Sequence, residues 1–247
     1  MIRTIICVLY VAISMIFLLP FGLIRLFIRL LGFRKLSSLI MRYIEHGWGW
    51  LLLAVAGGRA VVTGQENIPR TGGVCFVSNH GGFADIALLL AYSRRHIAFI
   101  AKKELLLAPL LNLWIVMIGG LFIDRKNPRK ALKTFNKGIA RLKADGAMII
   151  FPEGHRSRGQ GLLPFHPGSL KLATQAEAVI VPVAITGTYD LFEKNYRVIP
   201  GPLSLTFCKP INTADISAAD RKQALSGQIY AVIQEALNPI TSKPALP

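Results

Sequence analysis

The sequence predicts an α/β fold, a mixed, mostly parallel sheet flanked by helices, with an N-terminal hydrophobic membrane-associated helical segment. Two observations predict it. The first 58 residues are dominated by uncharged apolar runs, and from about residue 59 short apolar runs alternate with stretches of helical periodicity. A chain of 247 residues has room for one sizeable α/β domain plus an appendage. We therefore expect membrane-anchoring helices in residues 1–58 and a single α/β domain in residues 59–247.

The N-terminal segment is long enough to cross a membrane. Thr4 to Ile24 are 21 consecutive residues without a charge, which as a helix match the hydrocarbon thickness of about 30 Å. Arg3 precedes the run, whereas several basic residues follow it (Arg25, Arg29, Arg34, Lys35 and Arg42). This asymmetry places the C-terminal side in the cytoplasm if the segment spans. A signal peptide is disfavoured because no small-residue cleavage site follows the run.

A helix lying in one leaflet is the other interpretation of this segment. Arg25 and Arg29 are four residues apart among leucine, phenylalanine and isoleucine, as in an interfacial helix. A second uncharged run, residues 47–58, is too short to span but carries two tryptophans suited to a membrane interface. The sequence thus predicts membrane association and leaves a span and monotopic insertion open.

The α/β domain contains seven candidate strands, each an apolar run of four to six residues. They are Ala60–Thr63, Val74–Ser78, Ile97–Ala101, Leu121–Asp124, Ala147–Phe151, Ile180–Ile185 and Leu203–Cys208. Helical periodicity lies between several of them, at Ile86–Tyr92, Leu105–Met117, Pro128–Ala144 and Pro167–Gln175. The tail Asn238–Pro247, with three prolines, is expected to be a frayed end.

The helix from Pro128 has the clearest boundaries. Asn127 is suited to cap it, proline is favoured in a first turn, and Gly146 follows its end. One of its faces is basic, with Lys130, Lys133, Lys137 and Arg141. We interpret this face as solvated, with contact to anionic lipid headgroups as the less favoured alternative.

Composition points to an anionic partner at a membrane. Lys and Arg number 29 against 13 Asp and Glu, giving a net charge of +16 beside 52% hydrophobic residues and a mean hydropathy of +0.46. The charges are spread along the chain and no nucleic-acid-reading motif is present, so membrane lipids are favoured and nucleic acid is not expected. The three cysteines lie far apart without metal-ligand spacing, which suggests a reducing compartment, no disulfide and no zinc site.

One polar segment leaves a predicted strand and contains a candidate catalytic pair. His80 is an imidazole base suited to neutral pH, and Asp85 five residues later is placed to orient it. That combination is the base and orienting half of a catalytic triad, with a substrate hydroxyl as the nucleophile. The alternative is a capping aspartate beside a surface histidine, which the strand-end position and the flexible Gly81-Gly82 disfavour.

Three other strand ends carry candidate binding residues. Arg125 could hold a phosphate with its planar guanidinium, or form a turn-stabilising ion pair with Asp124. Glu153, Gly154 and Arg156 suggest a cradle for a phosphorylated ligand, in which Glu153 would bind a hydroxyl or orient Arg156. Lys103 would stabilise a developing oxyanion or a phosphate, or be a solvated charge. A metal held by Glu153, His155 and His166 is disfavoured because the spacing fits no known zinc pattern.

Taken in order, these segments resemble the glycerolipid acyltransferase family of the bacterial 1-acylglycerol-3-phosphate acyltransferase type. The matching motifs cover about residues 60–190: Asn-His-x₄-Asp at 79–85, Lys-Lys-Glu-Leu at 102–105, Gly-x-x-Phe-Ile-Asp-Arg at 119–125, Phe-Pro-Glu-Gly-x-Arg-Ser at 151–157 and Ile-Val-Pro-Val-Ala-Ile at 180–185. Each motif alone is weak, but five in this order are specific.

The resemblance implies that residues 59–247 are an acyltransferase catalytic domain. His80 would be the general base and Asp85 its partner. Glu153, Gly154 and Arg156 would belong to the acceptor site with Arg125 assisting, Lys103 would be an electrostatic stabiliser, and Pro182 would shape a pocket. The implied reaction transfers a fatty-acyl group from acyl-CoA or acyl carrier protein to lysophosphatidic acid in phospholipid biosynthesis. No cofactor or metal is expected, because a thiolate is a good leaving group.

Two positions depart from the family pattern. Gly82 lies where the catalytic motif often has serine, and His155 lies where threonine is usual in Glu-Gly-Thr-Arg. Both positions lie where the acceptor would bind, so another lysolipid acceptor is an alternative, and a non-catalytic basic membrane-surface protein is a second. A lipid hydrolase is disfavoured because no Gly-x-Ser-x-Gly motif supplies a nucleophile. We expect the enzyme at the cytoplasmic membrane, with its catalytic domain facing the cytoplasm.

Overall fold

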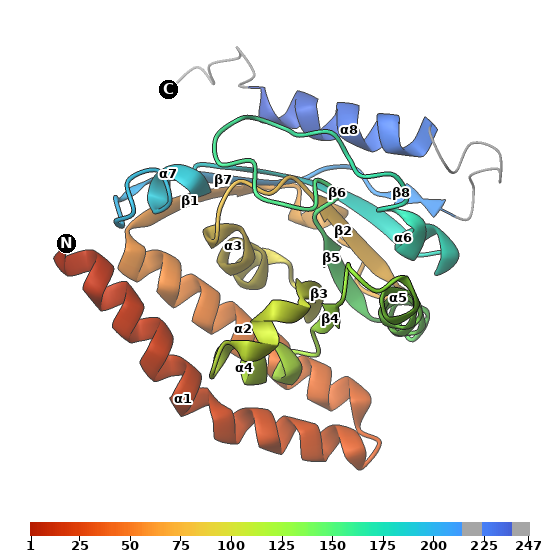
Figure 1. Ribbon diagram of the computed structural model, residues 1–247, viewed down its shortest axis with the longest axis horizontal. Coiled ribbons are helices and arrows are strands. Elements are labelled where there is room, and N and C mark those ends of the chain that lie inside the picture. The colour runs from red at the N-terminus through yellow and green to blue at the C-terminus, as the bar shows by residue number, and fades with distance from the viewer. Residues whose placement is uncertain (214–223, 239–247) are drawn as a thin grey trace.

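The computed structural model describes residues 1–213 and 224–238, in which an eight-stranded sheet lies between layers of helices (Figure 1). The strand order is β1-β7-β6-β2-β5-β3-β4, with β8 pairing with β6. The strands are β1 Gly58–Thr63, β2 Val74–Ser78, β3 Ile97–Lys102, β4 Leu121–Ile123, β5 Ala147–Ile150, β6 Val179–Thr186, β7 Gly201–Phe207 and β8 Ile211–Asn212. Five pairings are parallel, and β6 pairs antiparallel with β7 and β8. The predicted mixed, mostly parallel α/β sheet is therefore confirmed.

Helices cover both faces of the sheet. They are α1 Ile2–Leu30, α2 Arg34–Ala56, α3 Ala84–Tyr92, α4 Leu111–Met117, α5 Pro128–Lys143, α6 Lys171–Gln175, α7 Thr188–Leu191 and α8 Ala224–Leu237, with 3₁₀ turns at Gln65–Asn67 and Lys103–Leu107. Figure 1 shows α8 on the opposite side of the sheet from α1, α2 and α3.

The alternation of side chains along β2 divides the core between these two faces. Val74 and Phe76 pack with residues of α2 and α3, whereas Cys75 and Val77 pack with residues of α5, α6 and α8. All four side chains are fully buried. A central parallel strand that is apolar on both sides is what a sheet covered on both faces requires.

The two N-terminal helices form a hairpin beside the sheet (Figure 1). Among the described residues, α1 is the one helix long and apolar enough to cross a membrane, and only 11% of its most apolar window is buried. α2 packs closely on α3, and α1 contacts α4, where Gly22 lies against the side chain of Met117. The division into units at residue 58 stays a prediction, as does the choice between a span and monotopic insertion.

The interfacial interpretation of Arg25 was wrong. Its side chain points into the protein, where only 2% of the residue is exposed. The guanidinium donates to the carbonyl oxygen of Met117 and approaches the ring of His96 at 3.1 Å. Arg29, one turn later, is exposed as expected.

Two predicted helices are shorter in the structure than expected. The expected helix Leu105–Met117 is a 3₁₀ turn followed by α4, because Pro109 interrupts the helical hydrogen bonds and Leu110 has a positive φ of 64°. The expected helix Pro167–Gln175 begins only at Lys171, after Gly168 with a φ of 80°. Helix α8 was not predicted, although Leu225, Ile229 and Ile233 repeat at four-residue spacing. Of the tail expected to fray, residues 239–247 lie outside the described residues.

Candidate active site

The candidate residues follow the carboxyl ends of parallel strands, so the sheet brings them to one edge. His80 follows β2 and Glu153 follows its neighbour β5, while Lys103 and Arg125 follow β3 and β4 farther along the sheet. Ligands of open α/β sheets bind at this edge.

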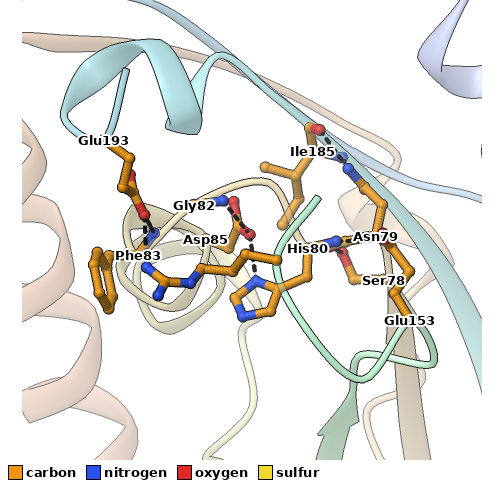
Figure 2. A network of polar contacts seen from close by, with 10 residues as sticks. Ser78, Asn79, His80, Gly82, Phe83, Asp85, Glu153, Ile185 and Glu193 are labelled. Atoms are coloured by element: carbon orange, nitrogen blue, oxygen red, sulfur yellow. Dashed lines mark hydrogen bonds and ion pairs between the residues drawn. The ribbon is translucent and has the colours of Figure 1, made fainter. Parts of the chain in front are cut away.

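His80 and Asp85 form a short, well-oriented pair (Figure 2). The Nδ1 atom of His80 lies 2.7 Å from Oδ2 of Asp85, which also accepts the backbone N–H of Gly82 at 3.1 Å. Asp85 lies in the first turn of α3 and is fully buried, whereas 19% of the His80 side chain is exposed. A buried carboxylate with two donors fixes the proton of the imidazole on Nδ1 and leaves Nε2 as the base.

The second nitrogen of His80 is free to meet a substrate. Among the described residues, no hydrogen-bond partner approaches Nε2, and Figure 2 shows it pointing away from Asp85. The ring stacks on Phe151 with a centroid distance of 4.0 Å and an interplanar angle of 17°. The aspartate and the phenylalanine therefore hold the ring in one orientation with one reactive nitrogen available.

Glu153 holds the loop of His80 through a backbone hydrogen bond. Its Oε1 atom accepts the backbone N–H of His80 at 2.8 Å, and Oε2 accepts that of Leu163 at 3.2 Å. Only 1% of the residue is exposed, and burial raises the pKa of its carboxyl although both backbone donors oppose the shift. Both carboxylate oxygens thus bind backbone groups, and a contact with an acceptor hydroxyl stays a prediction.

Arg156 pairs with a residue that the sequence did not single out. Its Nη1 atom lies 3.0 Å from Oε1 of Glu193, and its guanidinium carbon lies 3.6 Å above the ring of Phe83. The alternative in which Glu153 orients Arg156 was therefore wrong. Glu193 lies 37 residues beyond Arg156 in sequence, and no local spacing signals the pair.

The remaining candidates surround the same strand ends. Arg125 donates to the carbonyl oxygen of Gly154 at 3.0 Å, and Gly154 has a φ of 72° with the ring of His166 where a side chain would project. Lys103 binds Asp124 at 2.8 Å, which raises the pKa of the lysine. The expected turn at Asp124 and Arg125 is present, since the N–H of Asn127 donates to the carbonyl oxygen of Asp124 at 3.2 Å. The expected ion pair between the two residues was wrong, because the carboxylate of Asp124 binds Lys103 instead.

Asn79 is a structural residue of the motif whose role the sequence did not reveal. Its side-chain amide donates to the carbonyl oxygen of Ile185 at 2.9 Å and accepts the N–H of the same residue at 2.8 Å. It thereby joins the end of β2 to β6, the strand that contains Pro182, and fixes the start of the His80 loop.

A second histidine–carboxylate pair lies beneath the N-terminal helices, away from these strand ends. His96, immediately before β3, places Nδ1 2.8 Å from Oε1 of Glu45 on α2. Its Nε2 atom lies 3.1 Å from Arg25 and 2.9 Å from Arg141. Guanidinium nitrogens are donors only, so Nε2 is an acceptor and the imidazole is neutral. Burial, followed by the nearby arginines, lowers the pKa of His96 well below its usual value.

An α/β sheet with an oriented histidine base beside an arginine defines a class of site that can deprotonate a hydroxyl close to an anionic group. The chain belongs to the Acyltransferase family, whose model matches residues 59–186. The predicted family is therefore confirmed.

Similar proteins agree with this assignment. The chain is 35% identical to a 1-acyl-sn-glycerol-3-phosphate acyltransferase of Cocos nucifera over 69% of this chain and 55% of that protein. It is 32% identical to one of Borreliella burgdorferi over 65% of this chain and 63% of that protein. The chain thus spans less than two thirds of the length of these relatives. The crystal structure of the 1-acyl-sn-glycerophosphate (LPA) acyltransferase PlsC from Thermotoga maritima has a TM-score of 0.80, with 27% identity over 98% of both chains.

Proposed function

We propose that the protein transfers a fatty-acyl group from a thioester to the sn-2 hydroxyl of lysophosphatidic acid, which makes phosphatidic acid. The observation that carries the proposal is the His80–Asp85 pair, whose free Nε2 lies in the same strand-end region as Arg156. The names of the relatives support the acceptor and the reaction.

In the proposed mechanism, Nε2 of His80 takes the proton of the acceptor hydroxyl as its oxygen attacks the thioester carbonyl. The new C–O bond forms, the C–S bond breaks, and the thiolate leaves with the proton returned by the imidazolium. Asp85 stabilises the positive charge that His80 carries between these steps. General-base assistance of this kind contributes about 10²- to 10⁴-fold to the rate.

The acceptor phosphate would bind the cationic groups beside this base. Arg156 offers a guanidinium whose Nη1 alone has a protein acceptor among the described residues, and Arg125 lies nearby through its bond to Gly154. Glu153 would act on the acceptor through the loop of His80 that it supports. Lys103, already bound to Asp124, would add positive potential.

The apolar surface of α1 supports a location at the membrane, where lysophosphatidic acid is found. The basic residues that follow the uncharged run favour a catalytic domain on the cytoplasmic side. The net charge of +16 suits either donor, since coenzyme A and acyl carrier protein are both acidic. The reaction as proposed uses no cofactor or metal.

The test is acyl transfer by the detergent-solubilised protein from labelled acyl-CoA, and separately from acyl carrier protein, to a set of acceptors. We expect product with lysophosphatidic acid and its loss in His80→Ala, with folding checked by circular dichroism. Product with another lysolipid alone would move the proposal to that acceptor. Failure with both donors and every acceptor would reject catalysis in favour of a binding protein.

A further inference from the structure

We infer that Glu193 is a positioning residue that holds Arg156 ready for the acceptor phosphate. This inference rests on the proposed function, because it assigns a role within the same acceptor site. It also accounts for the glycine at position 82, one of the two departures from the family pattern.

Glu193 connects three segments that are distant in sequence. Its Oε1 atom accepts Nη1 of Arg156 at 3.0 Å. The same atom accepts the backbone N–H of Phe83, immediately before α3, at 2.6 Å, and Figure 2 shows Glu193 directed toward Phe83. Helix α3 carries Asp85 in its first turn. One carboxylate oxygen therefore fixes the arginine relative to the helix that orients the catalytic base.

Two contacts hold the guanidinium of Arg156, and its other nitrogens remain available to a ligand. The ring of Phe83 covers one face of the guanidinium, and Glu193 binds Nη1. In the described part of the chain, neither Nε nor Nη2 of Arg156 has a protein acceptor. The side chain of Arg156 is 23% exposed against 10% for Glu193, so the arginine is the member of the pair that a ligand reaches. A guanidinium held in this way can present its unused donors to a phosphate without first losing rotamer freedom.

The position of Glu193 requires glycine at residue 82. A Cβ atom at Gly82 would lie 2.8 Å from Oε2 of Glu193 and 2.9 Å from the backbone of Thr188. A serine here would therefore displace the carboxylate or the segment that carries it. Glycine at position 82 thus leaves room for both the carboxylate of Glu193 and the backbone of Thr188.

The opposite role would make Glu193 a resident anion that competes with the phosphate for Arg156. The contacts favour positioning, because the carboxylate is also bound by the N–H of Phe83 and is the more buried partner. The two roles predict opposite signs: removing a positioning group weakens phosphate binding, whereas removing a competitor strengthens it.

The experiment compares Glu193→Ala and Glu193→Gln with the wild-type protein, with Asp190→Asn as the matched control. Asp190 lies on the same segment and forms an exposed ion pair with Lys194. Binding of lysophosphatidic acid without donor is measured by calorimetry in detergent, and KM is measured for both substrates. We expect Glu193→Ala to weaken acceptor binding by about 10- to 100-fold with an unchanged donor KM. Glu193→Gln should stay within about threefold, since its amide oxygen accepts the same two donors.

Two further measurements isolate the phosphate. Transfer to an uncharged monoacylglycerol should be equally slow with and without Glu193→Ala, and the double variant Arg156→Ala/Glu193→Ala should bind no more weakly than Arg156→Ala alone. Tighter binding in either Glu193 variant would overturn the inference in favour of competition. If Glu193→Ala weakened the apparent affinities for donor and acceptor equally, Glu193 would have only a structural role. Wild-type protein that binds lysophosphatidic acid without turnover would sink the proposed function alone, whereas absence of binding would sink both.

Discussion

The protein contains two histidine–carboxylate pairs with nearly equal hydrogen bonds, 2.7 Å for His80–Asp85 and 2.8 Å for His96–Glu45. They differ in what the second nitrogen of the imidazole meets. Nε2 of His80 has no partner in the described residues, whereas Nε2 of His96 is capped by two arginines. The side chain of His80 is 19% exposed and that of His96 is 5% exposed.

The comparison shows that a carboxylate which orients a histidine does not by itself make a catalytic base. A base needs an accessible second nitrogen, and the arginines beside His96 occupy that nitrogen. The pair at His96 instead joins α2 to the residue immediately before β3 and, through Arg25 and Arg141, to α1 and α5. The histidine–carboxylate hydrogen bond thus orients a reactive group at His80 and connects helices to the sheet at His96.

The largest expected effect comes from Asp85→Asn. The amide cannot hold the same imidazole tautomer, so turnover should fall by about 10²- to 10⁴-fold with little change in acceptor binding. Steady-state kinetics with lysophosphatidic acid measure the change. Glu45→Gln is the matched variant in the other pair, and turnover per folded molecule should remain within a few-fold of wild type. Equal losses in both variants would remove the distinction between the two pairs.

The second effect is on stability and is expected in Glu45→Gln. This change removes the carboxylate that accepts Nδ1 of His96 and acts electrostatically on Arg25 and Arg141. Disturbing a hydrogen bond between buried groups costs about 1–3 kcal/mol. The free energy of unfolding in mild detergent, from urea titration, should fall by that order in Glu45→Gln. The matched control is Asp190→Asn, which removes an exposed charge and should leave the midpoint unchanged. An unaltered midpoint in Glu45→Gln would show that the contacts of Glu45 do not contribute to the stability of the fold.

The smallest effect is a dependence of stability on pH. Because the pKa of His96 is lowered in the folded protein, only the unfolded chain binds a proton at this position as the pH falls below about 6.5. The folded state should therefore lose up to about 1.4 kcal/mol per pH unit between pH 6.5 and 5 from this group. Unfolding curves at half-unit steps measure the slope, which should be shallower in His96→Gln. Identical slopes would contradict a neutral His96.

The two pairs also differ in how well the sequence predicts them. His80 and Asp85 are five residues apart at the end of a strand, so local spacing was enough to bring them together. Glu45 and His96 are 51 residues apart, and neither occurs in a recognisable motif. Their contact exists only because α2 packs against the sheet, which no local pattern specifies.

The same distinction between local and distant contacts applies to the rest of the molecule. The parallel sheet and the helix from Pro128 could be predicted, because their hydrophobic periodicity and end signals lie within short stretches of sequence. Helix lengths were wrong where one residue, Pro109 or Gly168, changed the backbone within an apolar pattern. Glu193 was missed because its partner Phe83 lies 110 residues away.

The inward-facing Arg25 has a consequence for the order of events during synthesis. It emerges from the ribosome early, yet its partners His96 and Met117 are 71 and 92 residues later in the chain. At about 5–20 residues per second, the arginine waits roughly 5–20 s for the last of these contacts. During that interval its charge needs a polar environment, because a buried guanidinium without partners is costly. The first helix can therefore make these contacts only after α4 and the segment that precedes β3 have been synthesised.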